Sequence, residues 1–478
     1  MARHPVGKQS PPMIIRSIPF LSRDFVHHHG KSKTGWWKEF RLDFSPNPLE
    51  FPFELVDEKT ILTLRDPAEG GVHSIDYHEK MRIYQHAIEH CNCLVDCEIM
   101  QYPDDMLPAE NLILSYHETD ERINLKKLEY VLFLSNRLKA RILKLALPIN
   151  NYSDLIKLPY YIRQSNKPTL VVGMGRLGKI SRILYPFLGS IGTYVGLDGH
   201  ETASGQLSET EATQYNLLSR TTQTAIGGVI GGPQVNGSLG PAHYNNLFQK
   251  RGIDAVYMPF PVENFNEFLH WMEWSNFHFS VYGFSCSMPF KHRLAYVSSG
   301  SLRVANCIIP QHNKVYNTDA DAFARAFVEL DVQPSDSILI YGSGGVAETA
   351  IRSASHFPHL YLAARNKFRR QALCNEYPCR GISQEALPHR KFDLLINCTP
   401  VGMRNEDLLT LLHINAPQKV IDVPYSKKPT PLITWARAQR VPSVDGKQFW
   451  QWQAQRQEEL FLEVLENDES RRIDNQEA

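Results

Sequence analysis

The sequence lacks the features that would place this protein in several large classes. Its 478 residues carry no net charge, because 51 Lys and Arg balance 51 Asp and Glu, whereas a nucleic-acid-binding protein usually concentrates basic residues in one domain. No apolar run approaches the ~18 residues that span a bilayer, and residues 1–12 lack the apolar stretch of a secretory signal. The sequence therefore predicts a soluble, cytoplasmic protein that binds neither nucleic acid nor membrane.

Cysteine is also scarce, since eight residues in 478 are too few for a disulfide framework in a chain of this length. Three of them lie close together at Cys91, Cys93 and Cys97, which invites a metal-binding interpretation. Paired zinc ligands usually come from a CxxC knuckle with a second pair elsewhere in the chain. Cysteines buried in a strand are the better interpretation, and we expect no metal.

The length predicts about three folding units at ~150 residues each. Over the first 220 residues, short β-branched and apolar runs alternate with longer amphipathic segments. Eight such runs match a small (β/α)8 barrel, in which the short connection between the first two runs is expected to be a loop. The predicted strands are residues 13–18, 38–44, 61–65, 93–99, 111–117, 141–146, 169–174 and 191–197.

A second α/β region begins near residue 223, where a glycine-rich segment leads into a new first strand. Further apolar runs at residues 338–341, 360–363, 394–397 and 420–423 predict an open, Rossmann-like sheet. The tail from Gly446 onward has helical spacing.

Two glycine-rich motifs are candidates for a dinucleotide-binding turn. Gly173-Met-Gly-Arg-Leu-Gly178 has Asp198 twenty residues further on, but it lies inside the seventh unit of the eightfold series. Gly342-Ser-Gly-Gly-Val-Ala347 opens the second series, where glycines let the backbone approach a pyrophosphate at a helix N-terminus. Arg365 and Arg369 follow the next strand, where NAD sites carry an acid, so the pattern favours NADP through its 2′-phosphate. A solvated basic face is the alternative for these arginines.

Polar residues of the first half collect toward the C-terminal ends of the predicted strands, where barrel enzymes hold their chemistry. Lys144 lies within an apolar run, and burial lowers a lysine pKa and makes the neutral amine a nucleophile toward a ketone. His117 offers a base near neutral pH, and Arg65 and Arg182 can hold a carboxylate. The alternatives are a lysine that points outward between helices and a histidine buried for structural reasons.

These residues together resemble the type I 3-dehydroquinate dehydratase family over about residues 12–215. The similarity rests on Ile61-Leu-Thr-Leu-Arg65 with Glu69-Gly-Gly71, Leu114-Ser-Tyr-His117, Lys144, and Gly173-Met-Gly-Arg-Leu-Gly-Lys-Ile-Ser-Arg182. The resemblance implies Lys144 as the Schiff-base lysine and His117 as the general acid and base. The substrate contacts that it implies are Glu39, Arg41, Arg65, Glu69, Arg182, Thr202 and Gln206. The family's Ser-Ala-Pro-Gly-Gln loop reads Thr202-Ala-Ser-Gly-Gln206 here, which keeps a hydroxyl but lacks the proline.

Two further residues of the second half have the chemistry of a proton-transfer pair. Lys291 follows a proline-containing turn and Asp319 lies at an element boundary. Such a pair in a cleft can work beside a hydride donor. Two unrelated surface residues are the alternative.

The second half is similar to shikimate dehydrogenase over about residues 226–470. The motifs that carry this similarity are Gly283–Lys291, Val304-Ala-Asn306, Asn317-Thr-Asp319, Gly342–Ala347, Asn397–Met403 and Asp445-Gly446…Gln453. The resemblance implies Lys291 and Asp319 as the catalytic pair. The residues that it implies for shikimate are Ser238, Ser287, Asn306, Tyr425 and Gln453. The residues implied for NADP are Gly342, Ser343, Gly344, Gly345, Val346, Ala347, Arg365, Arg369, Thr399, Gly446 and, near the nicotinamide, Met403.

The carboxylate-binding Ser-x-Ser-Pro loop of that family is altered in this sequence. Anchored on Pro241 and Asn245 it reads Ser238-Leu-Gly240-Pro241, so the first serine is kept and the second is glycine. Anchored from Gly228 to Pro233, the register moves by one residue and no serine matches. Loss of a hydroxyl donor to a carboxylate costs ~1.5–3 kcal/mol, which raises the Michaelis constant without abolishing turnover.

The sequence as a whole is interpreted as an α/β fusion enzyme of the shikimate pathway. Its predicted parts are a dehydratase barrel (1–222), a substrate-binding domain (223–320), a Rossmann NADP-binding domain (321–445) and C-terminal helices that return to the substrate domain (446–478). It would dehydrate 3-dehydroquinate to 3-dehydroshikimate and reduce that product to shikimate with NADPH, for chorismate and aromatic amino acid biosynthesis. The alternatives for the second half are a quinate or quinate/shikimate dehydrogenase, because of Gly240, and a catalytically silent module.

Overall fold

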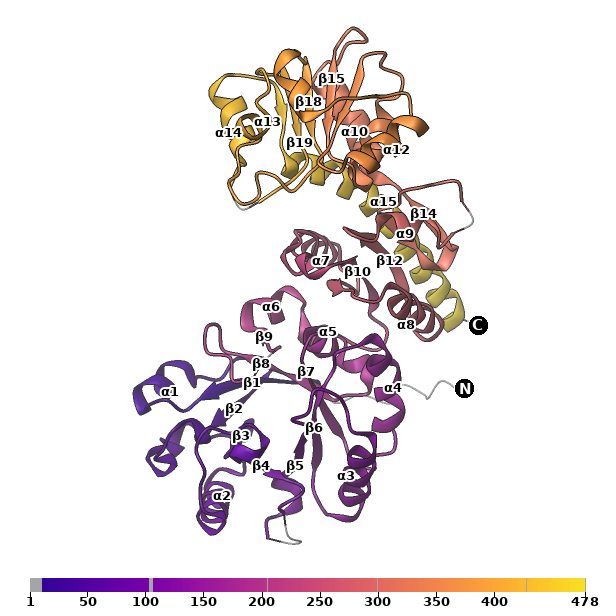
Figure 1. Ribbon diagram of the computed structural model, residues 1–478. Coiled ribbons are helices and arrows are strands. Elements are labelled where there is room, and N and C mark those ends of the chain that lie inside the picture. The colour runs from indigo at the N-terminus through magenta and orange to yellow at the C-terminus, as the bar shows by residue number, and fades with distance from the viewer. Residues whose placement is uncertain (1–10, 103–105, 204, 299, 427, 478) are drawn as a thin grey trace. The chain divides into compact units, whose positions relative to one another are not determined.

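The computed structural model describes residues 11–102, 106–203, 205–298, 300–426 and 428–477 (Figure 1). Two compact units make up the chain. Unit 1 comprises Met1–Ile226, Pro241–Pro259 and Glu263–Ser280, and unit 2 comprises Gly227–Gly240, Phe260–Val262 and Val281–Ala478. Among the described residues, no helix combines the length and the apolar character needed to cross a membrane.

Unit 1 contains a curled parallel sheet, in indigo to magenta in Figure 1, with the strand order β7-β6-β5-β4-β3-β2-β1-β8-β9. Its strands are buried along most of their length, which is why they read as continuous apolar runs in the sequence. All eight predicted strands are confirmed, and the short β9 is an addition. The strands are β1 (Met13–Pro19), β2 (Trp36–Arg41), β3 (Thr60–Thr63), β4 (Leu94–Glu98), β5 (Leu112–His117), β6 (Ile142–Pro148), β7 (Thr169–Met174), β8 (Gly192–Gly196) and β9 (Leu207–Ser208).

The connections of this sheet differ from the prediction in two places. The connection between the first two strands is not a plain loop, because it contains α1 (Arg23–His29), which begins where the Ser22 hydroxyl accepts the Phe25 N–H at 3.1 Å. The strand predicted to reach Phe44 ends at Arg41, since Leu42–Phe44 forms a 3-10 helix. The other α-helices of this region are α2 (Tyr77–Cys91), α3 (Leu125–Arg137), α4 (Tyr152–Ile162), α5 (Gly178–Ile183) and α6 (Glu209–Gln214).

A buried arginine bridges the seam between β7 and β8. The Nε of Arg182 donates to the carbonyl oxygen of Gly173 in β7 at 3.1 Å, and its Nη1 donates to that of Tyr194 in β8 at 3.0 Å. The backbone N–H of Ile191 adds a hydrogen bond of 2.9 Å to the carbonyl of Thr169. Arg182 therefore satisfies carbonyl groups on the two strands at which the curled sheet would close.

Unit 2 contains a six-stranded parallel sheet with the order β17-β16-β15-β18-β19-β20. The order reverses at β15, and ligands of such sheets bind outside the carboxyl ends of the strands at the point of reversal. The α/β fold class with a Rossmann-type sheet is as predicted. The elements are β15 (Ile338–Tyr341), β16 (Leu360–Ala363), β17 (Arg380–Gly381), β18 (Leu394–Asn397), β19 (Lys419–Asp422), β20 (Ser443–Val444), α10 (Thr318–Glu329), α11 (Gly345–Ser353), α12 (Lys367–Glu376), α13 (Leu408–Leu412), α14 (Pro431–Ala438) and α15 (Gly446–Glu477).

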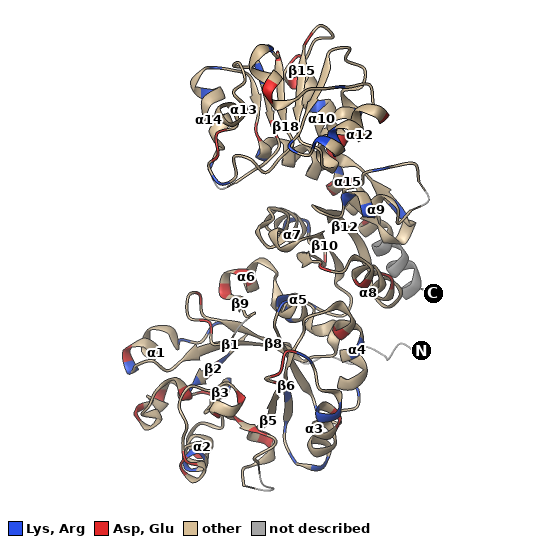
Figure 2. Ribbon diagram, in the orientation of Figure 1, with Lys and Arg blue, Asp and Glu red and all other residues tan. Residues whose placement is uncertain are grey.

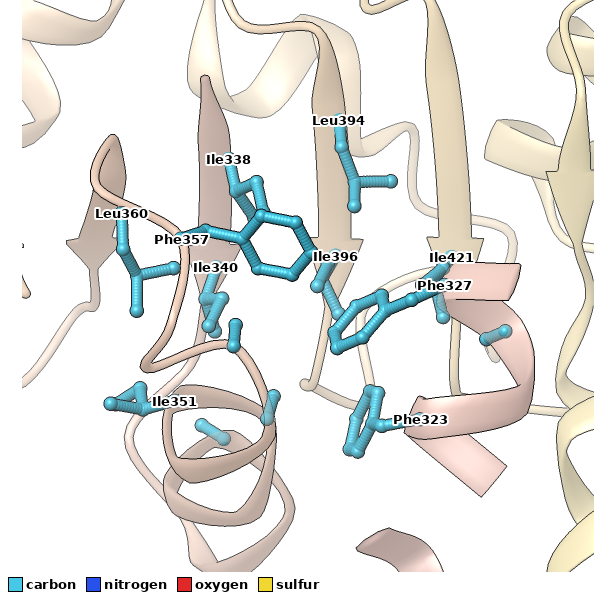
Figure 3. Close-up of a cluster of buried hydrophobic side chains, with 14 of the residues drawn as sticks. Phe323, Phe327, Ile338, Ile340, Ile351, Phe357, Leu360, Leu394, Ile396 and Ile421 are labelled. Atoms are coloured by element: carbon cyan, nitrogen blue, oxygen red, sulfur yellow. The ribbon is translucent and has the colours of Figure 1, made fainter. Parts of the chain in front are cut away.

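A buried apolar cluster fills one face of this sheet (Figure 3). Ile338 and Ile340 of β15 lie at its centre, and Phe323 and Phe327 of α10 reach toward them. The ring of Phe327 meets that of Phe357 edge-on, with 5.6 Å between centroids. Because α10 begins with Asn317, Thr318 and Asp319, the packing of its apolar face also fixes where Asp319 lies.

A smaller sheet has the order β11-β10-β12-β13-β14, in which β13 runs antiparallel to β12 and β14. The long α15 reaches back to β12, where the rings of Phe461 and Tyr282 lie 5.3 Å apart. The elements are β10 (Ala225–Gly231), β11 (Ala255–Pro261), β12 (Val281–Cys286), β13 (Cys307–Ile309), β14 (Lys314–Tyr316), α7 (Gly240–Arg251), α8 (Phe265–His278) and α9 (Lys291–Ala295).

We expect Phe323→Ala to lower the free energy of unfolding of the Rossmann region by about 3–5 kcal/mol, because it leaves a cavity in a closed core. Val328 lies on the same helix with 81% of its surface exposed, so Val328→Ala should stay within about 0.5 kcal/mol of wild type. Urea unfolding followed by circular dichroism checks both variants. Equal losses would contradict the packing of α10 on this sheet.

Candidate active sites

Lys144 points into the curled sheet of unit 1. Its side chain is 6% exposed, and its Nζ lies 2.9 Å from Asp96 Oδ2 and 3.5 Å from Glu39 Oε1. The ring of Tyr194 lies beneath it, 4.3 Å from Nζ to the centroid. The alternative of a lysine pointing outward between helices is therefore wrong.

Asp96 is the anion around which this site is assembled. It accepts hydrogen bonds from Lys144, from Arg65 Nη2 at 2.7 Å and from the Ser115 hydroxyl at 2.5 Å. Burial alone would raise the pKa of Asp96, but the charges of Arg65 and Lys144 outweigh it and hold the pKa well below its usual value. A permanent carboxylate thus faces the amine of Lys144.

The sequence reasoning missed Asp96 and its neighbour Glu98. Glu98 accepts from Arg65 at 3.0 Å and from Lys80 at 2.5 Å. The signal was available, because two acids alternate with Leu94, Val95 and Cys97 in an apolar strand. A buried acid needs a partner just as a buried lysine does, so these acids could have been predicted to lie beside buried cations.

His117 and Glu69 form a second pair at the carboxyl end of β5. His117 Nδ1 and its backbone nitrogen lie 3.0 Å and 3.1 Å from Glu69 Oε2. Burial raises the pKa of Glu69 to about 7, while burial and the charges of Arg65 and Lys144 lower the pKa of His117 well below its usual value. His117 is therefore neutral near pH 7, and a proton on Nδ1 that faces Glu69 leaves Nε2 as a proton acceptor.

The loop between β8 and β9 contacts the same interior through hydroxyl groups. The Thr202 hydroxyl lies 2.8 Å from that of Ser17, and the Ser17 hydroxyl donates to Glu39 Oε2 at 2.5 Å. Gln206 Oε1 accepts the Thr202 N–H at 2.9 Å. Ser204, where the family loop carries proline, lies outside the described residues.

The two remaining arginines predicted for the substrate differ in their partners. Arg41 makes two hydrogen bonds of 2.8 Å to Asp43. Arg182 is fully buried, and its Nη2 has no hydrogen-bond partner among the described residues. Burial lowers the pKa of Arg182 to about 10. A buried guanidinium with an open donor and no paired carboxylate is suited to receive an anion.

Lys291 and Asp319 meet in unit 2. The Nζ of Lys291 at the start of α9 contacts Asp319 Oδ2 in the first turn of α10, and the two side chains are only 12% and 5% exposed. Asn306 Nδ2 donates to Asp319 Oδ1 at 2.9 Å and to Gln453 Oε1 at 3.0 Å. The alternative of two unrelated surface residues is therefore wrong, and four predicted residues form one hydrogen-bonded group.

Gln457 and Thr318 belong to this group and were not predicted. Gln457 Nε2 donates to Thr318 Oγ1 at 3.1 Å and to Gln453 Oε1 at 3.0 Å. The Ser285 hydroxyl donates to Gln457 Oε1 at 2.5 Å. The spacing of Gln453 and Gln457 by one helical turn was the signal that could have identified the second glutamine.

Of the remaining residues predicted for shikimate, Tyr425 and Ser238 contact each other. The Tyr425 hydroxyl is hydrogen-bonded to the Ser238 side chain and to the Leu239 backbone, and burial raises the pKa of Tyr425. The Ser238 hydroxyl accepts the Gly240 N–H at 3.2 Å. Ser287 is half-buried just beyond β12. Tyr425 also lines a cavity of about 210 Å³ together with Lys428, Arg437, Asp445, Gly446 and Lys447.

The glycine-rich turn after β15 fits a dinucleotide pyrophosphate. Gly342 has φ of +135°, a conformation that residues with a side chain rarely adopt. A Cβ on Gly345 would lie 3.3 Å from Cβ of Lys291, whereas one on Gly344 would meet nothing within 4 Å. Gly344 caps α11 without a side-chain hydrogen bond, so the N–H groups of this helix remain available to an anion. Ser343 completes the turn, and Val346 and Ala347 lie in the first turn of α11.

The two predicted 2′-phosphate arginines lie at and just before α12, where blue ribbon marks the basic residues in Figure 2. Arg365 is exposed, whereas Arg369 Nη2 donates to Glu348 Oε2 at 2.8 Å. Beyond β18, the Thr399 hydroxyl donates to Asn397 Oδ1 at 2.7 Å, and Met403 is 48% exposed.

The parts of the chain that the structure describes contain no group of three or more His, Cys, Asp or Glu placed to hold an ion. Cys93 and Cys97 are buried in or beside β4, and burial raises the pKa of Cys93 to about 12. A thiol of this kind stays protonated and is a poor metal ligand.

Glu69→Gln tests the electrostatics of the dehydratase-like site. The folded protein binds a proton on Glu69 more tightly than the unfolded chain, because its pKa is about 7 and not the ordinary 4.5. Ionisation of Glu69 thus lowers stability as the pH rises through this window. The free energy of unfolding of Glu69→Gln, relative to wild type, should increase by about 1–3 kcal/mol between pH 4 and pH 8.

Urea unfolding at both pH values provides the measurement. Glu54→Gln, which removes a glutamate whose side chain is 60% exposed, is measured alongside as the surface control. A constant difference for Glu69→Gln across this range would mean that the Glu69 carboxyl titrates normally.

Comparison with known proteins relates these two sites to two families. Residues 39–222 match the family model of type I 3-dehydroquinase, and residues 229–300 match that of the shikimate dehydrogenase substrate-binding domain. The shikimate dehydrogenase (NADP(+)) of Pyrococcus furiosus is 29% identical over 236 residues, which cover 47% of this chain and 85% of that protein.

Two further relatives match across both halves. The shikimate biosynthesis protein AroDE of Chlamydia pneumoniae is 28% identical over 305 residues, covering 61% of this chain and 62% of that protein, less than two thirds of its length. The chloroplastic bifunctional 3-dehydroquinate dehydratase/shikimate dehydrogenase of Arabidopsis thaliana is 24% identical over 472 residues, covering 88% of this chain and 77% of that protein. Residues 39–222 are therefore similar to the type I 3-dehydroquinase family, and the second half of the chain is similar to the shikimate dehydrogenase family.

Proposed function

We propose that this chain catalyses two consecutive reactions of shikimate biosynthesis: dehydration of 3-dehydroquinate to 3-dehydroshikimate, and NADPH-dependent reduction of that product to shikimate. The observation that carries the proposal is the presence of two separate buried lysine–carboxylate pairs. Lys144 with Asp96 lies in the region that matches a dehydroquinase, and Lys291 with Asp319 lies beside a dinucleotide-type glycine turn. Each pair suits one of the two reactions.

In the first reaction, the Lys144 amine attacks the C3 ketone of 3-dehydroquinate, and loss of water gives a protonated imine. The imine acidifies the C2 proton, which Nε2 of His117 removes. His117 then returns a proton to the C1 hydroxyl as it leaves as water, and hydrolysis of the imine releases 3-dehydroshikimate and the free amine.

The electrostatics of unit 1 support these roles. Asp96 remains ionised, so it can stabilise the positive nitrogen that Lys144 carries as an imine. The low pKa of His117 keeps its imidazole neutral near neutral pH, so that it can accept a proton. The unpaired Nη2 of Arg182 is the donor that we assign to the substrate carboxylate. Glu39, Arg41, Arg65, Glu69, Thr202 and Gln206 are assigned to the remaining substrate contacts.

In the second reaction, bound NADPH supplies a hydride to C3 of 3-dehydroshikimate. Lys291 donates a proton to the C3 oxygen, and Asp319 holds the lysine ammonium in place. We assign Asn306 and Gln453, which contact each other beside Asp319, to the ring hydroxyls of the substrate. Ser238, Ser287 and Tyr425 are assigned to the remaining contacts.

Several features support NADP as the cofactor. β16 is followed by Ala364-Arg-Asn-Lys367, so no acid stands where NAD sites bind the ribose hydroxyls. Arg365 and Arg369 supply positive charge at this position. The glycine turn of Gly342–Ala347, with Thr399, Met403 and Gly446, is assigned to the rest of the cofactor.

The proposal keeps the division of the chain at residues 222, 320 and 445, the cytoplasmic location and the small-molecule partners predicted from the sequence. A quinate dehydrogenase is not favoured, because residues 229–300 match a shikimate dehydrogenase domain despite Gly240. A catalytically silent second half is not favoured either, since Lys291 and Asp319 are assembled with their neighbours.

Lys144→Met should abolish dehydration, by about 1,000-fold or more, while NADPH-dependent reduction of 3-dehydroshikimate persists. Borohydride added with 3-dehydroquinate should attach the reduced product to Lys144 and inactivate the wild-type dehydratase, as shown by mass spectrometry of the peptide. Unmodified Lys144 and undiminished activity would refute the Schiff-base assignment.

Lys291→Met should produce the reverse result, with reduction lost and dehydration retained, so each variant serves as the folding control for the other. A coupled assay from 3-dehydroquinate with NADPH or NADH measures both sites and the cofactor preference. Oxidation of shikimate and of quinate is compared in the same preparation. Loss of both activities in one variant would indicate that the variant misfolds, and not that the replaced lysine is catalytic.

A further inference from the structure

An acidic side chain stands in the first turn of α11, the helix whose N-terminus faces the proposed pyrophosphate site. Glu348 is only 2% exposed, and it follows Gly345, the last glycine of the turn, by three residues. A carboxylate at this place opposes the binding of an anion unless other groups neutralise it. Its partners therefore decide what it does.

Three donors surround the Glu348 carboxylate. His292 Nε2 and Arg369 Nη2 each lie 2.8 Å from Oε2, and the Tyr377 hydroxyl lies 2.9 Å from Oε1. Burial alone would raise the pKa of Glu348, but the hydrogen bonds from His292 and Tyr377 and the charge of Arg369 lower it. Glu348 is thus ionised, and its negative charge is balanced by neighbouring groups of the protein.

The donors come from two other elements that flank the cofactor turn. Arg369 lies on α12 and Tyr377 directly follows it, whereas His292 is next to Lys291 on α9. Close packing brings α9 and α11 together at Lys291 and Gly345. One carboxylate consequently joins the glycine-turn helix to the helix of the proposed 2′-phosphate site and to the helix of the proposed proton donor.

Arg369 is held through one terminal nitrogen of its guanidinium group. Its Nη2 donates to Glu348, and 40% of the side chain remains exposed. A guanidinium has five donors in a rigid plane, so fixing one nitrogen orients the others. Holding a long side chain in its binding rotamer before the ligand arrives saves the entropy of ordering it later.

We propose that Glu348 is a positioning residue that sets the preference for NADP: it holds Arg369 in the orientation that receives the 2′-phosphate. This inference rests on the proposed NADP-dependent dehydrogenase. Simple electrostatics predicts the opposite effect, because removal of a negative charge near an anion site would tighten binding of the anion. Loss of the Glu348 charge should therefore weaken binding of the 2′-phosphate if Glu348 positions Arg369, and strengthen it if Glu348 acts only by electrostatic repulsion.

The test compares Glu348→Gln with wild type in titrations with two fragments, 2′,5′-ADP, which carries the 2′-phosphate, and 5′-AMP, which lacks it. The Kd of 2′,5′-ADP should rise about tenfold, the factor of one charge-assisted hydrogen bond, while 5′-AMP binds no more weakly. The ratio of kcat/KM for NADPH to that for NADH should fall by a similar factor, mainly through the KM of NADPH.

Two controls keep the result interpretable. Glu329→Gln removes one exposed negative charge from α10 in the same unit and should change neither Kd. Dehydration of 3-dehydroquinate reports on unit 1, and circular dichroism reports on the folding of the whole chain. In the background of Arg369→Ala, Glu348→Gln should have no further effect on 2′,5′-ADP, because both changes remove the same interaction.

Unchanged or tighter binding of 2′,5′-ADP by Glu348→Gln would overturn the inference, as would an undiminished effect in the Arg369→Ala background. A wild-type protein that neither binds 2′,5′-ADP nor reduces 3-dehydroshikimate with NADPH would refute the proposed function itself. Wild-type activity with an unchanged Glu348→Gln variant would refute the role of Glu348 alone.

Discussion

The dehydratase-like unit depends on the neutralisation of charges that its sheet buries. Asp96 lies in the interior with Lys144 and Arg65 directly against it. Removing one member of such a set leaves an uncompensated charge, which is far more costly than the pair is stabilising. The same requirement fixes the rotamers of these side chains. Unpaired charges would destabilise an apolar core. Here their pairing orients an amine, a carboxylate and a base toward the same interior region of the curled sheet.

The dehydrogenase-like unit also neutralises a buried carboxylate, but with fewer charged side chains and more side-chain amides. Asp319 is held by Lys291 and Asn306, and Gln453 and Gln457 extend the network from α15. The glycine turn then lies against Lys291, because Gly345 has no side chain to separate them. A cofactor bound at this turn would therefore lie close to Lys291, the proposed proton donor.

Most of the strands could be predicted from the sequence, because apolar runs in parallel sheets are continuous and bounded by polar segments. The helix of residues 23–29 could not, since seven residues with three histidines show no apolar repeat, and only the Ser22 cap marks it. Among the site residues, Lys144 and His117 were identified because a charged group in an apolar strand is conspicuous. Asp96, Gln457 and Glu348 were missed because their importance lies in partners from distant parts of the chain.

The sequence by itself determined the two families, the order of the two halves and the residue types at each site, since these follow from motifs whose spacing is local. The tertiary structure alone decided which charges meet. Lys144 reaches Asp96 across 48 residues and Lys291 reaches Asp319 across 28, and no local pattern encodes such a contact. It also decided that Arg369 faces Glu348. The physical reason is that buried charges pair when separate elements pack against each other. The order of residues along one element does not specify which residue of another element it will meet.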